Sequence, residues 1–302
     1  MEWLDVLLGS CIRTTTPILL AALAGLPTLW TRDINIGLDG IMIFGAFFGV
    51  AVGLWTGSIW AALAITIALA ALAGLCFGVL VAGLKVDVFV AGIVLFVFAG
   101  AATAYLLTIL FGVKGNLADP ATPGLPAIII PGLADVPLVG ALLSGHSILT
   151  WLAVLLVAGL MIWDRRSVGV LYWRAAGSHP QALAASGVGV LRRRVLAQIW
   201  CFVFAALAGV QISLGQLSLF TVGMTGGVGF VALAVVIFSR GNVALVAVIS
   251  VGFGLVTALG YQTTNDVVPH EITVLFPYAV ALVALILLSR RSVRRTVAVR
   301  AA

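Results

Sequence analysis

Long apolar runs alternate with short polar segments along most of this chain. Residues 40–84 and 195–239 each run for 45 positions without an Asp, Glu, Lys or Arg. A helix crosses the hydrocarbon core of a bilayer in about 20 residues, so each run is long enough for two crossings. Because unpaired backbone amides are costly in lipid, the crossings must be helices or strands of a closed barrel, and these runs are too long and uniformly apolar for barrel strands.

The pattern predicts an all-α polytopic membrane protein with about eight to ten transmembrane helices. The first 13 residues carry Glu2, Asp5 and Arg13, and we expect them to form an interfacial helix or a lead-in rather than a cleaved signal. Residues 1–302 then form a single transmembrane domain. Nine spans are assigned, near residues 14–30, 35–54, 58–83, 88–111, 147–163, 197–217, 222–239, 243–262 and 272–289.

Composition supports this class, and the basic residues orient it. The chain is 63% hydrophobic and 9% charged, with a mean hydropathy of +1.24. Eleven of its sixteen Lys and Arg residues lie in two places, 164–196 and 290–302, which are expected to be cytoplasmic. Because successive spans cross the membrane in opposite directions, Arg32, Lys85 and Arg240 are expected on the cytoplasmic side too. The same alternation leaves the amino terminus and the proline-rich loop 112–146 outside. The net charge of +6 reflects this topology, so it does not point to nucleic acid.

Glycine recurs at positions that suit close helix packing. Gly45, Gly49, Gly53 and Gly57 follow one another every fourth residue, and Gly74 and Gly78 repeat the spacing in the next span. Such stripes let another helix backbone approach closely.

Two glycine-rich polar stretches, 35–40 and 221–229, open the second and seventh spans, where we expect the helix to be interrupted. The odd fifth span separates two groups of four with opposite topology, the arrangement expected of inverted repeats. Broken helices at matched positions indicate a translocation path, for which we select Asn35, Asp39, Phe220 and Thr225. Asp39 is either a functional acid at membrane depth or a headgroup-level partner of Arg32.

The chain lacks the motifs of an ATPase or a metal enzyme. Neither of its two lysines, Lys85 and Lys114, follows a glycine, so no Walker A loop is present. His146, His179 and His270 are far apart and have no zinc-ligand spacing. We therefore expect a transport subunit, not an enzyme, with no metal or cofactor of its own.

Several segments, in order, resemble the permeases of ABC importers of the branched-chain amino acid, ribose and nucleoside class. The most specific is the run from Arg174 to Val190. The others are Thr16-Pro17-Ile-Leu-Leu, Asn35-Ile-Gly-Leu-Asp-Gly-Ile-Met42, Phe220 through Gly229-Phe-Val-Ala-Leu-Ala234, and Leu275-Phe-Pro-Tyr278. The Gly-Ala-Phe tract at 45–47 is most similar to the simple sugar and nucleoside subgroup. That subgroup usually has Glu where this chain has Asp39, and an acidic residue where it has Ser178.

The resemblance implies a type II importer permease of a bacterial plasma membrane. A separate ABC ATPase would use ATP, a second related permease would complete the pathway, and a receptor would deliver a nucleoside or simple sugar. Residues 180–186 would form a short coupling helix that Gly187 ends in a left-handed conformation. The residues assigned to ATPase coupling are Arg174, His179, Pro180, Ala184, Ala185 and Gly187. The alternative is an ion-coupled secondary transporter, which would need no ATPase.

Overall fold

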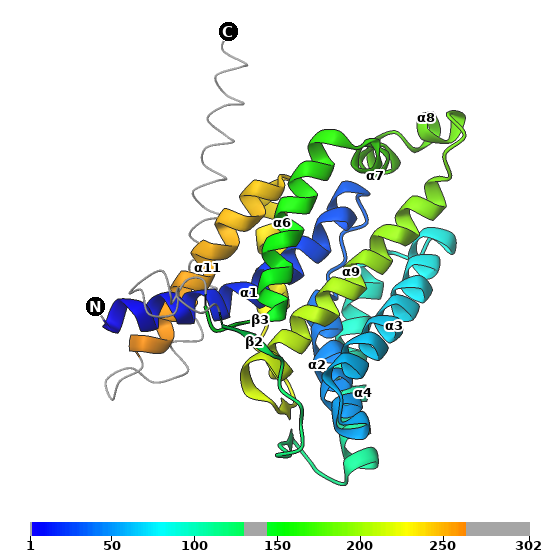
Figure 1. Cartoon of the computed structure of the whole chain (residues 1–302). Helices are drawn as coiled ribbons and strands as arrows, with labels where there is room; N and C mark the ends of the chain where they lie inside the picture. Colours follow the sequence, from blue (N-terminus) through cyan, green and yellow to red (C-terminus); the bar gives the residue numbers. More distant parts are fainter. Residues whose placement is uncertain (1, 130–143, 264–302) are drawn as a thin grey trace.

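The computed structural model describes residues 2–129 and 144–263, and this part of the chain is mainly helical (Figure 1). Turns of π-helix, η1 (Val79–Gly83) and η2 (Ser213–Leu217), follow α3 and α9 directly. The helices are α1 (Glu2–Trp30), α2 (Leu38–Thr56), α3 (Ile59–Gly78), α4 (Val88–Phe111), α6 (Ile148–Arg166), α7 (Val168–Ser178), α8 (Pro180–Ala185), α9 (Val190–Ile212), α10 (Val228–Ser239) and α11 (Val243–Thr263).

Seven helices in the described ranges are long and apolar enough to cross a membrane, and α10 is a shorter apolar helix. The predicted span 88–111 coincides with α4. Two predicted starts were wrong. The first span continues a helix that begins at Glu2, and the seventh begins at Val228 because residues 222–227 form turns. The predicted span 272–289 and the basic tail 290–302 lie outside the described residues.

Helix α9 lies at the centre of the bundle, where it packs against α1, α2 and α3. The glycine stripes account for two of these contacts. A Cβ added at Gly45 would collide with the backbone of Ala206, and one at Gly74 would lie 2.9 Å from the Cα of Ile199. The predicted close backbone approach is confirmed at both positions. Gly57 instead ends α2 in a left-handed conformation, with φ +63°.

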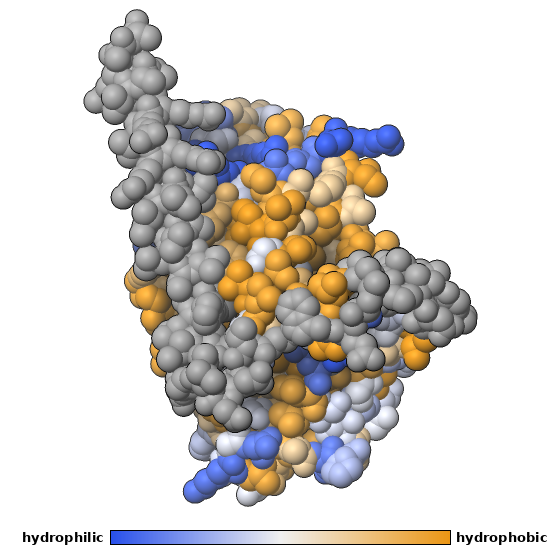
Figure 2. Space-filling view, turned by 90° about the vertical axis from the view of Figure 1, so that its left-hand side faces the viewer, coloured by the Kyte–Doolittle hydropathy of each residue, from blue (hydrophilic) through white to orange (hydrophobic). Residues whose placement is uncertain are grey.

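Polar groups gather at the two ends of the bundle, and Figure 2 shows a broad apolar band between them. One end brings together the segments predicted to be cytoplasmic: Trp30 packs on Trp173, and Arg194 pairs with Asp33. The other end carries two short strand pairs. These are β1 (Asn116–Leu117) with β4 (Phe220–Thr221), and β2 (Ala127–Ile128) with β3 (His146–Ser147). The described parts of the predicted external loop therefore lie at the end opposite the coupling region.

Candidate solute path and coupling segment

Asp39 joins the two predicted helix breaks. It stands in the first turn of α2, and the residue is 3% exposed. Thr225 Oγ1 donates to its Oδ2 at 3.0 Å, and the backbone N–H of Gly229 donates to its Oδ1 at 2.9 Å. Gly229 lies in the first turn of α10, whose amide groups lack partners within the helix, so the carboxylate satisfies one of them. The alternative pairing with Arg32 is therefore wrong.

Glycine at position 229 is a requirement of this contact. A Cβ placed there would lie 2.7 Å from the Cβ of Asp39 and closer still to its backbone. Real Cβ atoms do not approach other atoms this closely, so any side chain at 229 would separate α2 from α10. The glycine-rich stretch that was predicted to interrupt the helix thus also lets its neighbour come near.

Asn35 is held by a residue that sequence reasoning missed, Gln198 of α9. The Asn35 Nδ2 donates to Gln198 Oε1 at 3.2 Å, and Gln198 Nε2 donates to the carbonyl of Asp33 at 3.0 Å. Asn35 Oδ1 in turn accepts from the N–H of Gly37 at 2.9 Å, one residue before α2 begins. Both amide side chains are 1% exposed. The sequence signal for this contact was Gln198 itself, an uncharged polar residue inside the apolar run 195–239, because a buried amide in a membrane span must find hydrogen-bond partners.

A charged contact lies beside this amide pair. Arg194 Nε is 3.3 Å from Asp33 Oδ2, an ion pair without hydrogen-bond geometry. Burial raises the pKa of Asp33 above its ordinary value, and the nearby Arg194 charge offsets part of that rise. Arg194 and Gln198 lie one turn apart on α9, so this end of the helix contacts the 31–37 segment through both a charge and an amide.

The four residues selected for the solute path do not form a single cluster. Asp39 and Thr225 meet, whereas Asn35 bonds to Gln198, and Phe220 packs edge-on against Phe47 at 5.3 Å between ring centroids. All four residues are buried, with exposed fractions of 3% or less. Their role in the solute path stays a prediction, and the structure places them at buried contacts between segments that are distant in sequence.

The base of the predicted coupling region is anchored on α1 and α9. Trp173 of α7 packs against Trp30, Trp163 and Trp200, and its Nε1 donates to the carbonyl of Arg193. Gly177 lies so close to the backbone of α1's carboxyl end that a Cβ there would overlap the carbonyl of Trp30. This arrangement makes α7 a fixed support for the segment that follows it.

The short helix expected at 180–186 is α8, with Pro180 in its first turn. Leu183 faces inward at 5% exposure, and Gly187 adopts the predicted left-handed conformation, with φ +79°. Arg174 is only partly free, since it pairs with Asp164 at 2.7 Å and lies over the ring of Trp30. The other predicted coupling residues are exposed on this segment: His179, Pro180, Ala184, Ala185 and Gly187.

Comparison with known proteins gives one family and several relatives. Residues 7–285 match the family described as branched-chain amino acid transport system / permease component. The chain is 28% identical, over 88% of its length and 80% of the relative, to the "Putative glucose ABC transporter permease protein" of Haloferax volcanii. It is 26% identical to the guanosine ABC transporter permease protein of Bacillus subtilis, over 80% of this chain and 77% of that one. It is 25% identical to the nucleoside ABC transporter permease protein of Lactococcus lactis, over 94% and 92%.

No solved structure matches the chain significantly. The family match covers most of the sequence, including every helix from α2 to α11, and the relatives are matched over more than three quarters of their own lengths. Membership implies a separate ABC ATPase as partner. The chain belongs to the family of branched-chain amino acid transport system permease components, and it is a multi-pass membrane protein that serves as the permease subunit of an ABC importer.

Proposed function

We propose that this permease imports nucleosides or simple sugars across a bacterial plasma membrane. Sugar and nucleoside permeases are among its relatives, and they support this choice of solute. A second related permease would complete the pathway, and a receptor outside the membrane would deliver the solute. The end that carries α7 and α8 would face the cytoplasm, where the ATPase uses ATP, and the basic residues 290–302 would lie on the same side of the membrane. Loop 112–146 would form the external cap.

The proposal that the ATPase is coupled to the solute path rests on an uninterrupted series of contacts from α7 to Asp39. Helix α7 rests on the end of α1 through Trp173 and Gly177. The segment that follows α1 is bonded to α9 through Asp33 and Asn35, and it leads directly into Asp39. Motion of the ATPase at α8 would therefore reach the start of α2 through packed and hydrogen-bonded neighbours.

The bond between α2 and α10 is the element that this motion would change. Asp39, Thr225 and Gly229 form a polar contact between two helix starts. Turning α2 relative to α10 would expose these groups to a solute on one side of the membrane at a time, as alternating access requires. Asn35 and Phe220 border the same two breaks and would supply an amide and an aromatic ring.

A reconstitution experiment tests the proposal directly. Liposomes holding this chain with its ATPase and second permease, supplied with receptor and ATP, should accumulate labelled guanosine or glucose. The same chain alone, given an ion gradient and no ATP, should accumulate neither. Concentrative uptake by the chain alone would contradict the proposal and establish the secondary transporter in its place.

A further inference from the structure

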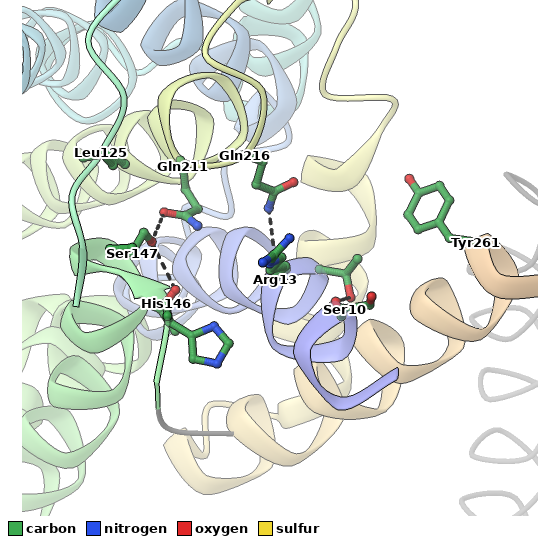
Figure 3. Close-up of a pocket in the computed structure, with 13 residues that line it drawn as sticks. Ser10, Arg13, Leu125, His146, Ser147, Gln211, Gln216 and Tyr261 are labelled. Carbon is green, nitrogen blue, oxygen red and sulfur yellow. Dashed lines mark hydrogen bonds between the residues drawn. The ribbon is translucent and has the colours of Figure 1, made fainter. Parts of the chain in front are cut away.

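A polar pocket opens at the predicted external end of the bundle, away from the contacts just described. It has a cavity volume of about 430 Å³ and lies between the first half of α1, the start of α6, and η2 (Figure 3). Its lining includes Arg13, Ser147, Thr150, Gln211, Gln216 and Tyr261. Pockets that take small solutes in proteins begin at about 300 Å³, so this one has room for a sugar ring.

Gln211, at the external end of α9, presents a buried polar side chain to this pocket. The residue is 2% exposed, and Ser147 Oγ donates to its Oε1 at 2.6 Å. Its Nε2 donates to no atom of the described residues, and Gln211 lines the pocket. Buried amide donors are normally paired, so a donor directed into a cavity is one that a ligand can satisfy.

A chain of hydroxyl groups holds that amide in one orientation. Ser147 Oγ lies 3.2 Å from Thr150 Oγ1, which lies 3.1 Å from Thr16 Oγ1 on α1. The Ser147 hydroxyl donates its one hydrogen to Gln211 Oε1 and can accept from Thr150 Oγ1, so the Gln211 Nε2 is left for the pocket. The amide is thus positioned by two other helical segments before any solute arrives.

The backbone is shaped around the same amide. After Ile212, α9 passes into the π-turn η2, and π-turns within helices frequently occur at functional sites. A Cβ added at Gly215 would lie 2.7 Å from Gln211 Oε1, so glycine leaves the space that the amide occupies. Gln216 Nε2 donates to the carbonyl of Arg13 at 2.8 Å and fixes the rim between η2 and α1.

We propose that this pocket is an outer binding site for the polyhydroxylated ring of the solute, either a ribose or a hexose. Gln211 Nε2 would donate to a ring hydroxyl, and the Arg13 guanidinium at the rim would donate to a second one. The inference rests on the proposed function, and it adds a site before the helix breaks. The turn η2, which borders the pocket, is followed along the chain by Phe220 and Thr225, so the pocket is connected through the backbone to the predicted path.

Two substitutions of Gln211 separate binding from structural support. Gln211→Glu keeps the shape and the acceptor for Ser147 but removes the N–H donor, and Gln211→Met keeps only the shape. Losing one hydrogen bond to a neutral hydroxyl should raise the KM for uptake by about 3- to 10-fold in both variants, with the maximal rate largely retained. An unchanged KM in either variant, or a loss of maximal rate alone, would overturn the site.

Labelling of the rim tests binding without relying on transport. In a Cys76→Ala background, which removes the exposed native thiol, Gln216→Cys should react with a thiol reagent, and guanosine or glucose should slow that reaction. Guanosine and glucose are assayed separately, so protection by one identifies the ring. Absence of protection by both would refute the outer site even if ATP-driven uptake is normal. Protection without ATP-driven uptake would leave the site standing while contradicting the proposed function.

Discussion

Gly187 allows the coupling proposal to be tested through the backbone alone. It follows α8 with φ +79°, and its N–H donates to the carbonyl of Ala184 at 3.0 Å. A Cβ added there meets no heavy atom within 4 Å, so the Cβ itself causes no collision. The cost of Gly187→Val is then the left-handed conformation itself, about 1–2 kcal/mol for a residue with a Cβ.

That cost corresponds to a factor of about 5 to 30 in the population of the native turn. The variant either retains a strained turn or opens the last turn of α8, which moves Ala184 and Ala185. We expect ATP-driven uptake to fall by about that factor while membrane insertion stays near normal. Gly187→Asn should be milder, since Asn tolerates the left-handed region better than Val.

Gly112→Val provides the matched control. Gly112 ends α4 with φ +66°, has open space around its Cβ position and lies at the opposite end of the bundle. The assay compares uptake into liposomes and copurification of the ATPase for both variants. The reasoning would be refuted if Gly187→Val transported at the parental rate, or if Gly112→Val reduced uptake by as much.

Three further predictions concern the contacts of α9 and the segment before α2. Gln198→Leu removes the partner of Asn35 Nδ2 and the side-chain donor to the Asp33 carbonyl, so we expect a loss of about 2–6 kcal/mol in stability and a lower Tm in detergent. An unchanged Tm would contradict the assigned bonds. The pKa of Asp33 is raised in the folded protein, so its contribution to stability is complete below about pH 4 and is lost as pH rises through that raised pKa. The Tm of the wild type should therefore fall relative to the Tm of Asp33→Asn over that pH interval. A Tm that instead rose with pH relative to Asp33→Asn would show that the charge of Arg194 outweighs burial in setting the pKa of Asp33. Gly209→Val would drive a side chain into the Met42 carbonyl and cost about 3 kcal/mol or more, which should reduce the yield of monodisperse protein. Gly100→Val, on an open face of α4, should be tolerated. Equal yields of the two variants would argue against the close α2–α9 crossing.

The positions of most helices could be predicted because their signals are local. Helix α4 starts after Asp87, whose carboxylate accepts from the N–H groups of Phe89 and Val90, and it stops at the left-handed Gly112. The apolar residues between them fill one span. The breaks before α2 and α10 were predictable for the same reason, since glycines and polar residues weaken a helix wherever they fall.

Partners distant in sequence could not be predicted. Asn35 and Gln198 are 163 residues apart, and their bond depends on how far α9 slides along the 31–37 segment. No local pattern encodes that register. The start of α1 was misjudged because Glu2, Asp5 and Arg13 suggested a boundary, yet charges near a membrane surface do not interrupt a helix. Asp39 was selected correctly as unusual, but its bond with Gly229 required the fold.

Helix α9 carries its two buried glutamines thirteen residues apart, which at about 1.5 Å per residue separates them by about 20 Å along the axis. Between them, close contacts at Gly45 of α2 and Gly74 of α3 hold the backbone of α9 against its neighbours, so we expect the helix to move as a rod. A displacement at the Gln198 end should therefore be felt at Gln211. Thermodynamic linkage makes the effect reciprocal: whatever the ATPase does to solute affinity in the outer pocket, solute there must do to the affinity of the ATPase end for its own partner.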